Sequence, residues 1–257
     1  MSDAAKHNDR NPEAAEFGYR PVDPTQKAGL VREVFDSVAS RYDLMNDLMS
    51  GGIHRLWKHE LIRLIRPRPG EHLLDVAGGT GDVAFAFLKA ARTGGKATVC
   101  DINPSMLRVG RDRAINRGLI DGLDWVCGSA ESLPMPDQSV DVYTIAFGLR
   151  NVTHIDDALA EAKRVLKPGG RFYCLEFSHV GLPLLRQAYD AWSFIMIPRI
   201  GELVAGDRDS YQYLVESIRR FPRQEELADR MRDAGFSAAS WRNLTGGIAA
   251  IHIGQVD

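Results

Sequence analysis

The 257-residue sequence has few cysteines and no long apolar run, and each shortage argues against a kind of protein. The three cysteines, Cys100, Cys127 and Cys174, are far apart and lack the C-x-x-C spacing of zinc or redox sites. They lie in or at the end of apolar stretches, so we expect buried thiols in a reducing compartment and predict no metal site. No stretch of about 18 consecutive apolar residues occurs, so no segment is expected to span a membrane.

An excess of charge of one sign is also missing. The formal net charge is −2, from 32 Lys and Arg against 34 Asp and Glu, which provides no basic footprint for nucleic acid. The first residues, MSDAAKHNDRNPEAAEF, contain no apolar core and are not arginine-rich, so neither a signal peptide nor a transit peptide is expected. We therefore expect a cytoplasmic protein. Its hydrophobic content of 44% suffices for one large domain, with or without a small appendage.

The most informative stretch is LLDVAGGTGD, residues 73–82. Its apolar start, residues 73–77, predicts a buried strand, and the apolar run 82–88 after the glycines predicts the beginning of a helix. A strand, a glycine turn and a helix in this order open a nucleotide-binding α/β fold. Glycines let a ligand approach the backbone closely, and the amides at the helix N-terminus face that ligand.

Two acids narrow the choice of ligand. Asp75 ends the first strand, and Asp101 ends the next apolar run about 20 residues further on, where an acid can accept both ribose hydroxyls. The spacing Gly79-x-Gly81-x-x-Ala84 matches a dinucleotide motif, so NAD is one alternative. A carboxylate at Asp75 would repel a pyrophosphate but favours the ammonium and sulfonium of S-adenosylmethionine (SAM), which we prefer. An ordinary tight turn is the third alternative.

The remaining pattern alternates strands with helices, which predicts a parallel, doubly wound sheet. The predicted strands are residues 73–77, 96–101, 123–127, 140–147 and 171–177, with helices from 82, 104, 155 and 224 and an antiparallel closing pair at 238–244 and 247–253.

Three further regions flank this pattern. Residues 1–26 are polar with scattered prolines and are expected to form a flexible arm. Residues 27–70 are expected to form an N-terminal helical cap, whose second helix, 53–65, turns one apolar face inward. That predicted inward face consists of Leu56, Leu61, Leu64 and Ile65. Within the α/β domain, 71–257, an insertion at about 182–222 carries an apolar helical face that is either a packed lid or the wall of an apolar substrate site.

Taken together, these pieces resemble the class I SAM-dependent methyltransferases. The resemblance implies a Rossmann-like fold with a doubly wound, seven-stranded, mostly parallel sheet, and SAM as cofactor. It assigns the methionine end of SAM to Gly79, Thr80 and Gly81 beside Asp75, the ribose to Asp101, and the adenine to the stretch 128–131 with Ser129 and Ala130. It also assigns Ala146 to the adenosyl group, although a small polar residue is expected there.

The match is closer still to the ubiquinone and menaquinone biosynthesis C-methyltransferases, the UbiE family. The segments that carry it are RYDLMNDLMSGGIHRLWK (41–58), LLDVAGGTGDVAF (73–85), AFGLRNV (146–152) and FPRQEELADRMRDAGF (221–236). The resemblance covers about residue 27 to the C-terminus. It implies methyl transfer from SAM to a ring carbon of a prenylated quinol, either demethylmenaquinol or a polyprenyl methoxybenzoquinol.

The chemistry of such a transfer predicts the catalytic residues. A quinol carbon becomes nucleophilic when an adjacent hydroxyl loses its proton, so the enzyme has to stabilise a phenolate. Arg150 is a permanent cation at the carboxyl edge of the sheet, and a water held by Arg150 and Asn151 could accept the proton. Tyr42 in the cap is expected to close over the ring, and His154 is the more ordinary candidate base. Arg150 pairing with an acid and Tyr42 packing in the core are the alternatives.

Several alternatives remain at this point. The chain could be an NAD(P) oxidoreductase, a methyltransferase for another lipid or phenol, or a non-catalytic subunit of a quinone-synthesis complex. A polyprenylated substrate would favour peripheral contact with the inner membrane. The apolar insertion could equally meet a second subunit, which would make a homodimer.

Overall fold

The computed structural model describes residues 15–38, 47, 50, 52–119, 121–181 and 208–257. Its main sheet has the predicted seven strands, and their order is β5-β4-β3-β6-β7-β9-β8. The strands are β3 (His72–Val76), β4 (Lys96–Asp101), β5 (Leu123–Cys127), β6 (Val140–Ala146), β7 (Leu166–Phe177), β8 (Ser240–Leu244) and β9 (Ala249–Gln255). The first five are parallel to one another, whereas β9 runs antiparallel to both β7 and β8.

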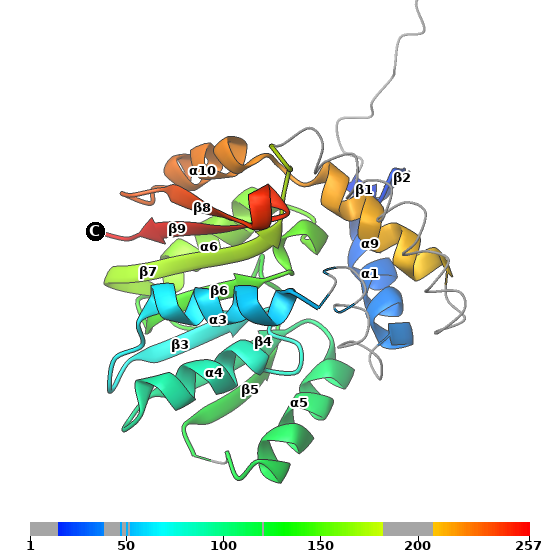
Figure 1. The fold of residues 1–257 in the computed structure, drawn as a ribbon. Coiled ribbons are helices and arrows are strands. Elements are labelled where there is room, and N and C mark those ends of the chain that lie inside the picture. The colour runs from blue at the N-terminus through cyan, green and yellow to red at the C-terminus, as the bar shows by residue number, and fades with distance from the viewer. Residues whose placement is uncertain (1–14, 39–46, 48–49, 51, 120, 182–207) are drawn as a thin grey trace, which may run out of the picture.

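Helices cover both faces of this sheet (Figure 1). They are α1 (Pro24–Val38), α3 (His54–Ile65), α4 (Asp82–Ala91), α5 (Pro104–Asn116), α6 (Ile155–Val165), α9 (Arg208–Arg220) and α10 (Gln224–Asp233), with short 3-10 turns η2 (Leu149–Asn151) and η4 (Thr245–Gly247). The core forms two clusters because successive strand residues point to opposite faces. Leu73 joins α3 and α4 in one cluster, whereas Leu74 joins α6 and α10 in the other.

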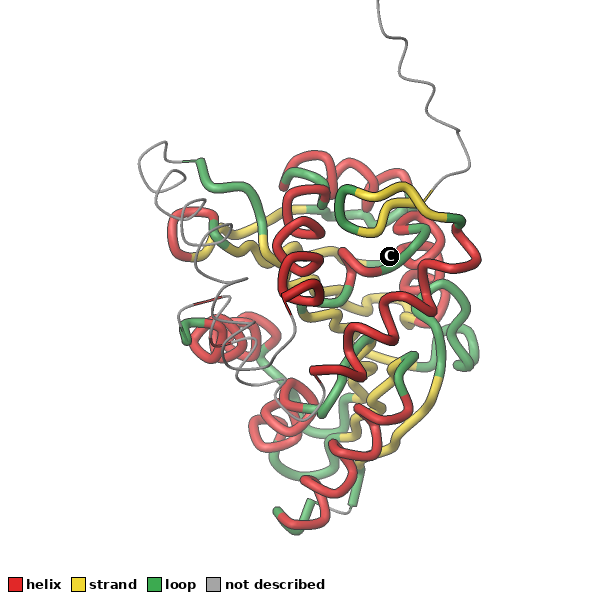
Figure 2. Tube along the Cα trace, turned by 90° about the vertical axis from the view of Figure 1, so that its right-hand side faces the viewer, coloured by secondary structure: helices red, strands yellow, loops and turns green. Residues whose placement is uncertain are grey.

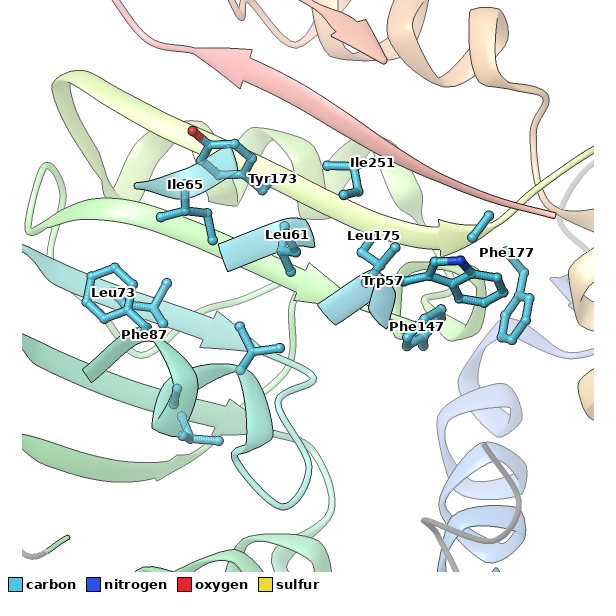
Figure 3. Packing of buried hydrophobic residues seen from close by; sticks show 14 of the residues in the cluster. Trp57, Leu61, Ile65, Leu73, Phe87, Phe147, Tyr173, Leu175, Phe177 and Ile251 are labelled. Atoms are coloured by element: carbon cyan, nitrogen blue, oxygen red, sulfur yellow. The ribbon is translucent and has the colours of Figure 1, made fainter. Parts of the chain in front are cut away.

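The cap helix α3 packs on the sheet with Trp57, and not the predicted Leu56, on its inner face. Trp57 is 3% exposed and its indole N–H donates to Thr245 Oγ1 at 2.8 Å, whereas Leu56 is 69% exposed. The prediction that Leu56 points inward is therefore wrong, while Leu61 and Ile65 are buried as predicted. Figure 3 shows Trp57, Leu61 and Ile65 together with residues of β7. The indole ring of Trp57 buries more apolar area than the side chain of Leu56 would, which favours the helix orientation that places Trp57 inward.

The N-terminal segment differs from the flexible arm expected over residues 1–26. The strands β1 (Ala15–Phe17) and β2 (Arg20–Val22) form an antiparallel hairpin, and α1 begins three residues before the predicted start at residue 27. Asp23 explains the early start, since its Oδ1 accepts the backbone N–H of Thr25 and caps the first turn. Figure 2 views the chain from the side on which this hairpin, α1 and α9 lie.

Two more features concern the second half of the chain. Strand β7 begins at Leu166, five residues before the predicted start at 171, because Leu166 pairs with Val140 and the Gly169 N–H donates to Val256 O. The apolar insertion from 182 to 207 lies outside the described residues, whereas the remainder of the expected lid begins with α9. No described helix is both long enough and apolar enough to cross a membrane.

Candidate active site

The glycine turn after β3 uses its glycines in two different ways. Gly81 has φ +81° and begins α4, and a Cβ there would lie 2.7 Å from Trp125 Cη2, so this glycine allows close packing. Gly79 has φ +54° and lines a cavity at the carboxyl edge of the sheet. Its N–H donates to Asp101 Oδ2 at 2.8 Å, which ties the turn to the end of β4.

The cavity collects residues from the ends of four strands and from the cap. The turn after β3 contributes Ala77 and Gly79, and the end of β4 with the start of α5 contributes Asp101, Ile102, Asn103 and Met106. The loop after β5 contributes Gly128 to Glu131, and the loop after β6 contributes Phe147, Gly148 and Asn151 to Thr153. Helix α1 contributes Ala28, Val31 and Arg32. Ligands of open α/β sheets bind at this edge. The structure thus brings Gly79, Asp101, Ser129, Ala130 and Asn151 to one cavity.

Asp101 is held as an oriented acceptor in the wall of this cavity. Its Oδ2 accepts the Gly79 N–H and its Oδ1 accepts the Asn103 N–H, both at 2.8 Å. Burial raises the pKa of Asp101, and these two backbone donors oppose that shift by stabilising the anion. A fixed carboxylate with remaining lone pairs can accept two hydroxyl donors, as the ribose of an adenosyl cofactor offers. Ile102, Met106 and Ala130 supply apolar surface for a flat ring.

Asp75 lies in a smaller cavity on the other side of the glycine turn. Its Oδ1 accepts the Thr144 hydroxyl at 2.7 Å, whereas its Oδ2 is buried without a hydrogen-bond partner among the described residues. Burial raises the pKa of Asp75 to about 7. Lys58, Thr80 and Ala146 line the same cavity. A buried acceptor lacking a donor fits the cationic methionine end of SAM, so the two cavities together suit this cofactor.

Thr80 and the stretch 128–131 are held by local contacts. Thr80 is 2% exposed, and its Oγ1 accepts a hydrogen bond from Arg113 Nη1 at 3.1 Å. The Ser129 Oγ accepts the Glu131 N–H at 3.2 Å and shapes the turn after β5. These contacts fix the walls beside the predicted methionine and adenine positions.

Arg150 pairs with an acid, which is the alternative considered from the sequence, but the partner is buried and was not named there. Its Nη1 donates to Glu176 Oε1 at 2.6 Å and to Phe147 O at 2.7 Å, and both charged side chains are 1% exposed. Since Glu176 balances its charge, Arg150 does not stand as the unpaired cation expected beside a phenolate. The contact instead supports Phe147, which has φ +59°, a conformation uncommon outside glycine.

The other predicted catalytic residues are placed as follows. Asn151 lines the main cavity, and its Oδ1 accepts the Tyr213 hydroxyl at 3.0 Å. His154 lies in an adjacent, more polar cavity, with its Nδ1 3.1 Å from Glu131 Oε1. Tyr42 lies outside the described residues.

Sequence reasoning missed two buried residues here. Glu176 is the lone acid in the apolar strand RFYCLEF, which is a visible signal for a buried ion pair. Tyr213 lies on α9 in a segment interpreted only as part of a lid, and its pattern carries no comparable signal.

The strand order, the glycine turn and the acid after β4 define a class I SAM-dependent methyltransferase. The chain belongs to the ubiE/COQ5 methyltransferase family, whose model matches residues 23–256. It is a SAM-dependent C-methyltransferase of this family, as the sequence predicted, rather than an NAD(P) oxidoreductase.

Curated relatives are similar over nearly their whole length. The chain is 59% identical over 240 residues to the ubiquinone/menaquinone biosynthesis C-methyltransferase UbiE of Brucella abortus (strain S19), with 93% of this chain and 89% of that protein covered. The UbiE of Brucella anthropi is also 59% identical, with 91% of its length covered.

Solved structures support the fold. A SAM-dependent methyltransferase from Aquifex aeolicus matches with a TM-score of 0.58 at 16% identity, over 92% of this chain and all of that one. A Thermotoga maritima SAM-dependent methyltransferase, a possible histamine N-methyltransferase by its title, matches with a TM-score of 0.61 at 20% identity, over 88% and 100%.

Proposed function

We propose that this chain methylates a ring carbon of a prenylated quinol, demethylmenaquinol or a polyprenyl methoxybenzoquinol, in menaquinone or ubiquinone biosynthesis. The observation that carries the proposal is the shared cavity. The residues suited to the adenosyl group, Asp101 and Ala130, line the same cavity as Asn151 of the FGLRN segment. A cofactor and an aromatic acceptor can therefore meet in one enclosure, which is the geometric requirement of a transfer reaction.

The cavity offers both apolar and polar surface for a quinol. Val31, Phe147 and Val152 can hold the ring and keep water away from it, while Asn151 supplies an amide for a ring oxygen. Behind the wall, the Phe147 ring packs 6.3 Å from Trp57 and 5.0 Å from Phe177, centroid to centroid, so the cap helix α3 supports the enclosure.

Bound SAM supplies an electrophilic methyl group. The task of the chain is to make the acceptor carbon nucleophilic, which requires a ring hydroxyl to lose its proton. A free phenol has a pKa of about 10, so hydrogen-bond donors in a dry cavity have to favour the anion. Asn151 is placed to donate, and the ion pair of Arg150 and Glu176 holds the loop that carries it.

The test is to incubate the purified protein with methyl-labelled SAM and each reduced quinol and to locate the label by mass spectrometry. We expect the label on a ring carbon of at least one quinol. The oxidised quinones are matched chemical controls, since they lack the ring hydroxyl that must be deprotonated. Asp101→Asn is expected to abolish the transfer by weakening the binding of SAM, and calorimetry with S-adenosylhomocysteine as the probe measures this loss of affinity.

Each assay is run with and without phospholipid vesicles. This comparison tests the accompanying proposal that the enzyme binds the prenylated quinol at a membrane surface. Cofactor binding without transfer to either quinol would contradict the proposed function and indicate another phenol or lipid as acceptor.

A further inference from the structure

Asn151 is contacted from outside the cavity by a residue with no role in the proposal above. The Tyr213 hydroxyl, on α9, donates to Asn151 Oδ1 at 3.0 Å. Tyr213 is 4% exposed and lines the neighbouring polar cavity rather than the main one. It therefore reaches Asn151 from outside the main cavity.

This contact determines which end of the amide is available. An asparagine amide has an oxygen that accepts and a nitrogen that donates, on opposite sides of the amide carbon. Because Tyr213 engages Oδ1, the end of the amide that remains for a ligand in the main cavity is the donor, Nδ2. Burial raises the pKa of Tyr213 well above its ordinary value, so the hydroxyl stays protonated and remains a donor.

The N-terminal hairpin holds Tyr213 in this position. The Phe17 ring stacks on the Tyr213 ring with centroids 4.0 Å apart and 15° between the planes. One turn further along α9, Glu216 accepts the Tyr19 N–H at 3.0 Å, and the Arg220 Nη1 lies 3.0 Å from Glu16 Oε1. The ring is thus clamped between the hairpin and the loop that carries Asn151, which leaves few alternative orientations of the hydroxyl.

From this geometry we infer that Tyr213 is a positioning residue, which holds the Asn151 amide so that its N–H donors face a ring oxygen of the acceptor. The inference rests on the proposed function, because it assigns a role toward the phenol. Asn151 then recognises the acceptor as a hydrogen-bond acceptor and stabilises the ionised ring oxygen more than the neutral hydroxyl. Arg150 does not replace it, since Glu176 already balances the guanidinium charge.

The experiment is a double-mutant cycle in single-turnover methylation of the reduced quinol. Tyr213→Phe keeps the ring that stacks on Phe17 and deletes only the hydroxyl. We expect its rate to fall about tenfold, as for the loss of one hydrogen bond, with S-adenosylhomocysteine affinity unchanged. In the Asn151→Ala background the same substitution is expected to have no further effect, because its target is gone. Ser217→Ala is the matched control, since it removes a buried hydroxyl that donates within α9 to Leu214 O.

A second measurement does not depend on turnover. The absorbance of 4-nitrophenol, added with S-adenosylhomocysteine, reports how much of the bound phenol is ionised at a given pH. We expect the ionised fraction to fall in Tyr213→Phe and Asn151→Ala and to stay at the wild-type level in Ser217→Ala. Equal rate losses from Tyr213→Phe in both backgrounds, or an unchanged ionised fraction, would overturn the inference. A wild-type protein that methylates no quinol would instead refute the proposed function, and the 4-nitrophenol titration would still decide the role of Tyr213.

Discussion

At the scale of single residues, Asp75 combines deep burial with a cavity that suits a cation. The side chain is almost inaccessible, and burial raises the pKa of its carboxyl to about 7, against the opposing hydrogen bond from Thr144. A positively charged ligand beside Oδ2 would favour the ionised form and lower this pKa. Ligand binding and proton release at Asp75 are therefore linked.

We predict that S-adenosylhomocysteine, which keeps the ammonium of the cofactor, releases about half a proton per site at pH 7, since a group with a pKa near 7 is half protonated there. Calorimetry in buffers of different ionisation enthalpy measures this number. Asp75→Asn should bring it close to zero. The control is Glu60→Gln on α3, because the hydrogen bond from Arg63 holds the pKa of Glu60 low, so its carboxyl has no proton to release. Equal release from the wild type and Asp75→Asn would contradict the assignment.

The residues around this site differ in how far the sequence could predict them. Gly79, Asp101 and Ser129 follow three parallel strands, so their meeting at one edge follows from the strand pattern. Their contact with the cofactor stays a prediction. The partner of Arg150 was not predictable in the same way, because Glu176 is 26 residues away and comes close only through the register of β6 with β7.

At the scale of elements, the ion pair of Arg150 and Glu176 joins η2 to the end of β7. Both charges are removed from water, and a buried pair of this kind is costly to break from one side. The same guanidinium holds Phe147 O, so the pair also supports the strained backbone at the start of the FGLRN loop. Loss of either partner should disturb the loop as well as the global stability.

We expect Glu176→Gln to lower the free energy of unfolding by about 3 kcal/mol or more, because it leaves a guanidinium buried without its counterion. Urea unfolding followed by circular dichroism measures the change. Asp156→Asn is the matched control, because it breaks an exposed ion pair. The side chain of Asp156 is 72% exposed and that of its partner Arg230 is 44% exposed, so the variant should lower the free energy of unfolding by less than about 1 kcal/mol. Similar losses in the two variants would show that the buried pair contributes no more than a surface one.

Element boundaries also show what a sequence pattern can determine. Strands β4 and β5 begin and end at the predicted residues. The apolar run of β4 marks a buried parallel strand, whereas β5 lies at the edge of the sheet and its side chains are half-buried or exposed. The period of α3 predicted the helix and the burial of Leu61 and Ile65, but not the contact of the buried Trp57 with Thr245. That contact joins residues 188 positions apart, so no local pattern contains it.

At the scale of the whole molecule, buried titratable groups pull the pH dependence of stability in opposite directions. Burial raises the pKa of Asp75, Asp101 and Glu176, so these carboxyls favour the folded state at low pH, and this contribution is lost as the pH rises through their folded values. Burial lowers the pKa of His54 and His252, which favour the folded state at higher pH. The measured dependence of stability on pH is the sum of both contributions. The contribution of a single group is therefore best isolated by comparing the wild type with a variant that lacks it.

The contribution of His252 to the pH dependence of stability is the clearest to isolate, because its side chain is 1% exposed and burial lowers its pKa to about 4. Its Nε2 bonds to Gln224 O at 2.9 Å, whereas Nδ1 is buried without a partner among the described residues, so a proton there would have no acceptor. In the unfolded chain the pKa is about 6.5. Between these values the unfolded state binds more protons, and stability from His252 is lost as the pH falls from about 6.5 to 4.

Between pH 7 and pH 5 the wild type should therefore lose about 2 kcal/mol more free energy of unfolding than His252→Gln, whatever the variant costs at pH 7. Urea unfolding at both pH values gives the four free energies. His59→Gln is the control, because His59 lies at an exposed position of α3, and this variant should keep the wild-type loss. If His252→Gln loses as much stability as the wild type, the acid sensitivity of the fold comes from elsewhere, and the closing strand β9 tolerates a charged histidine in its buried face.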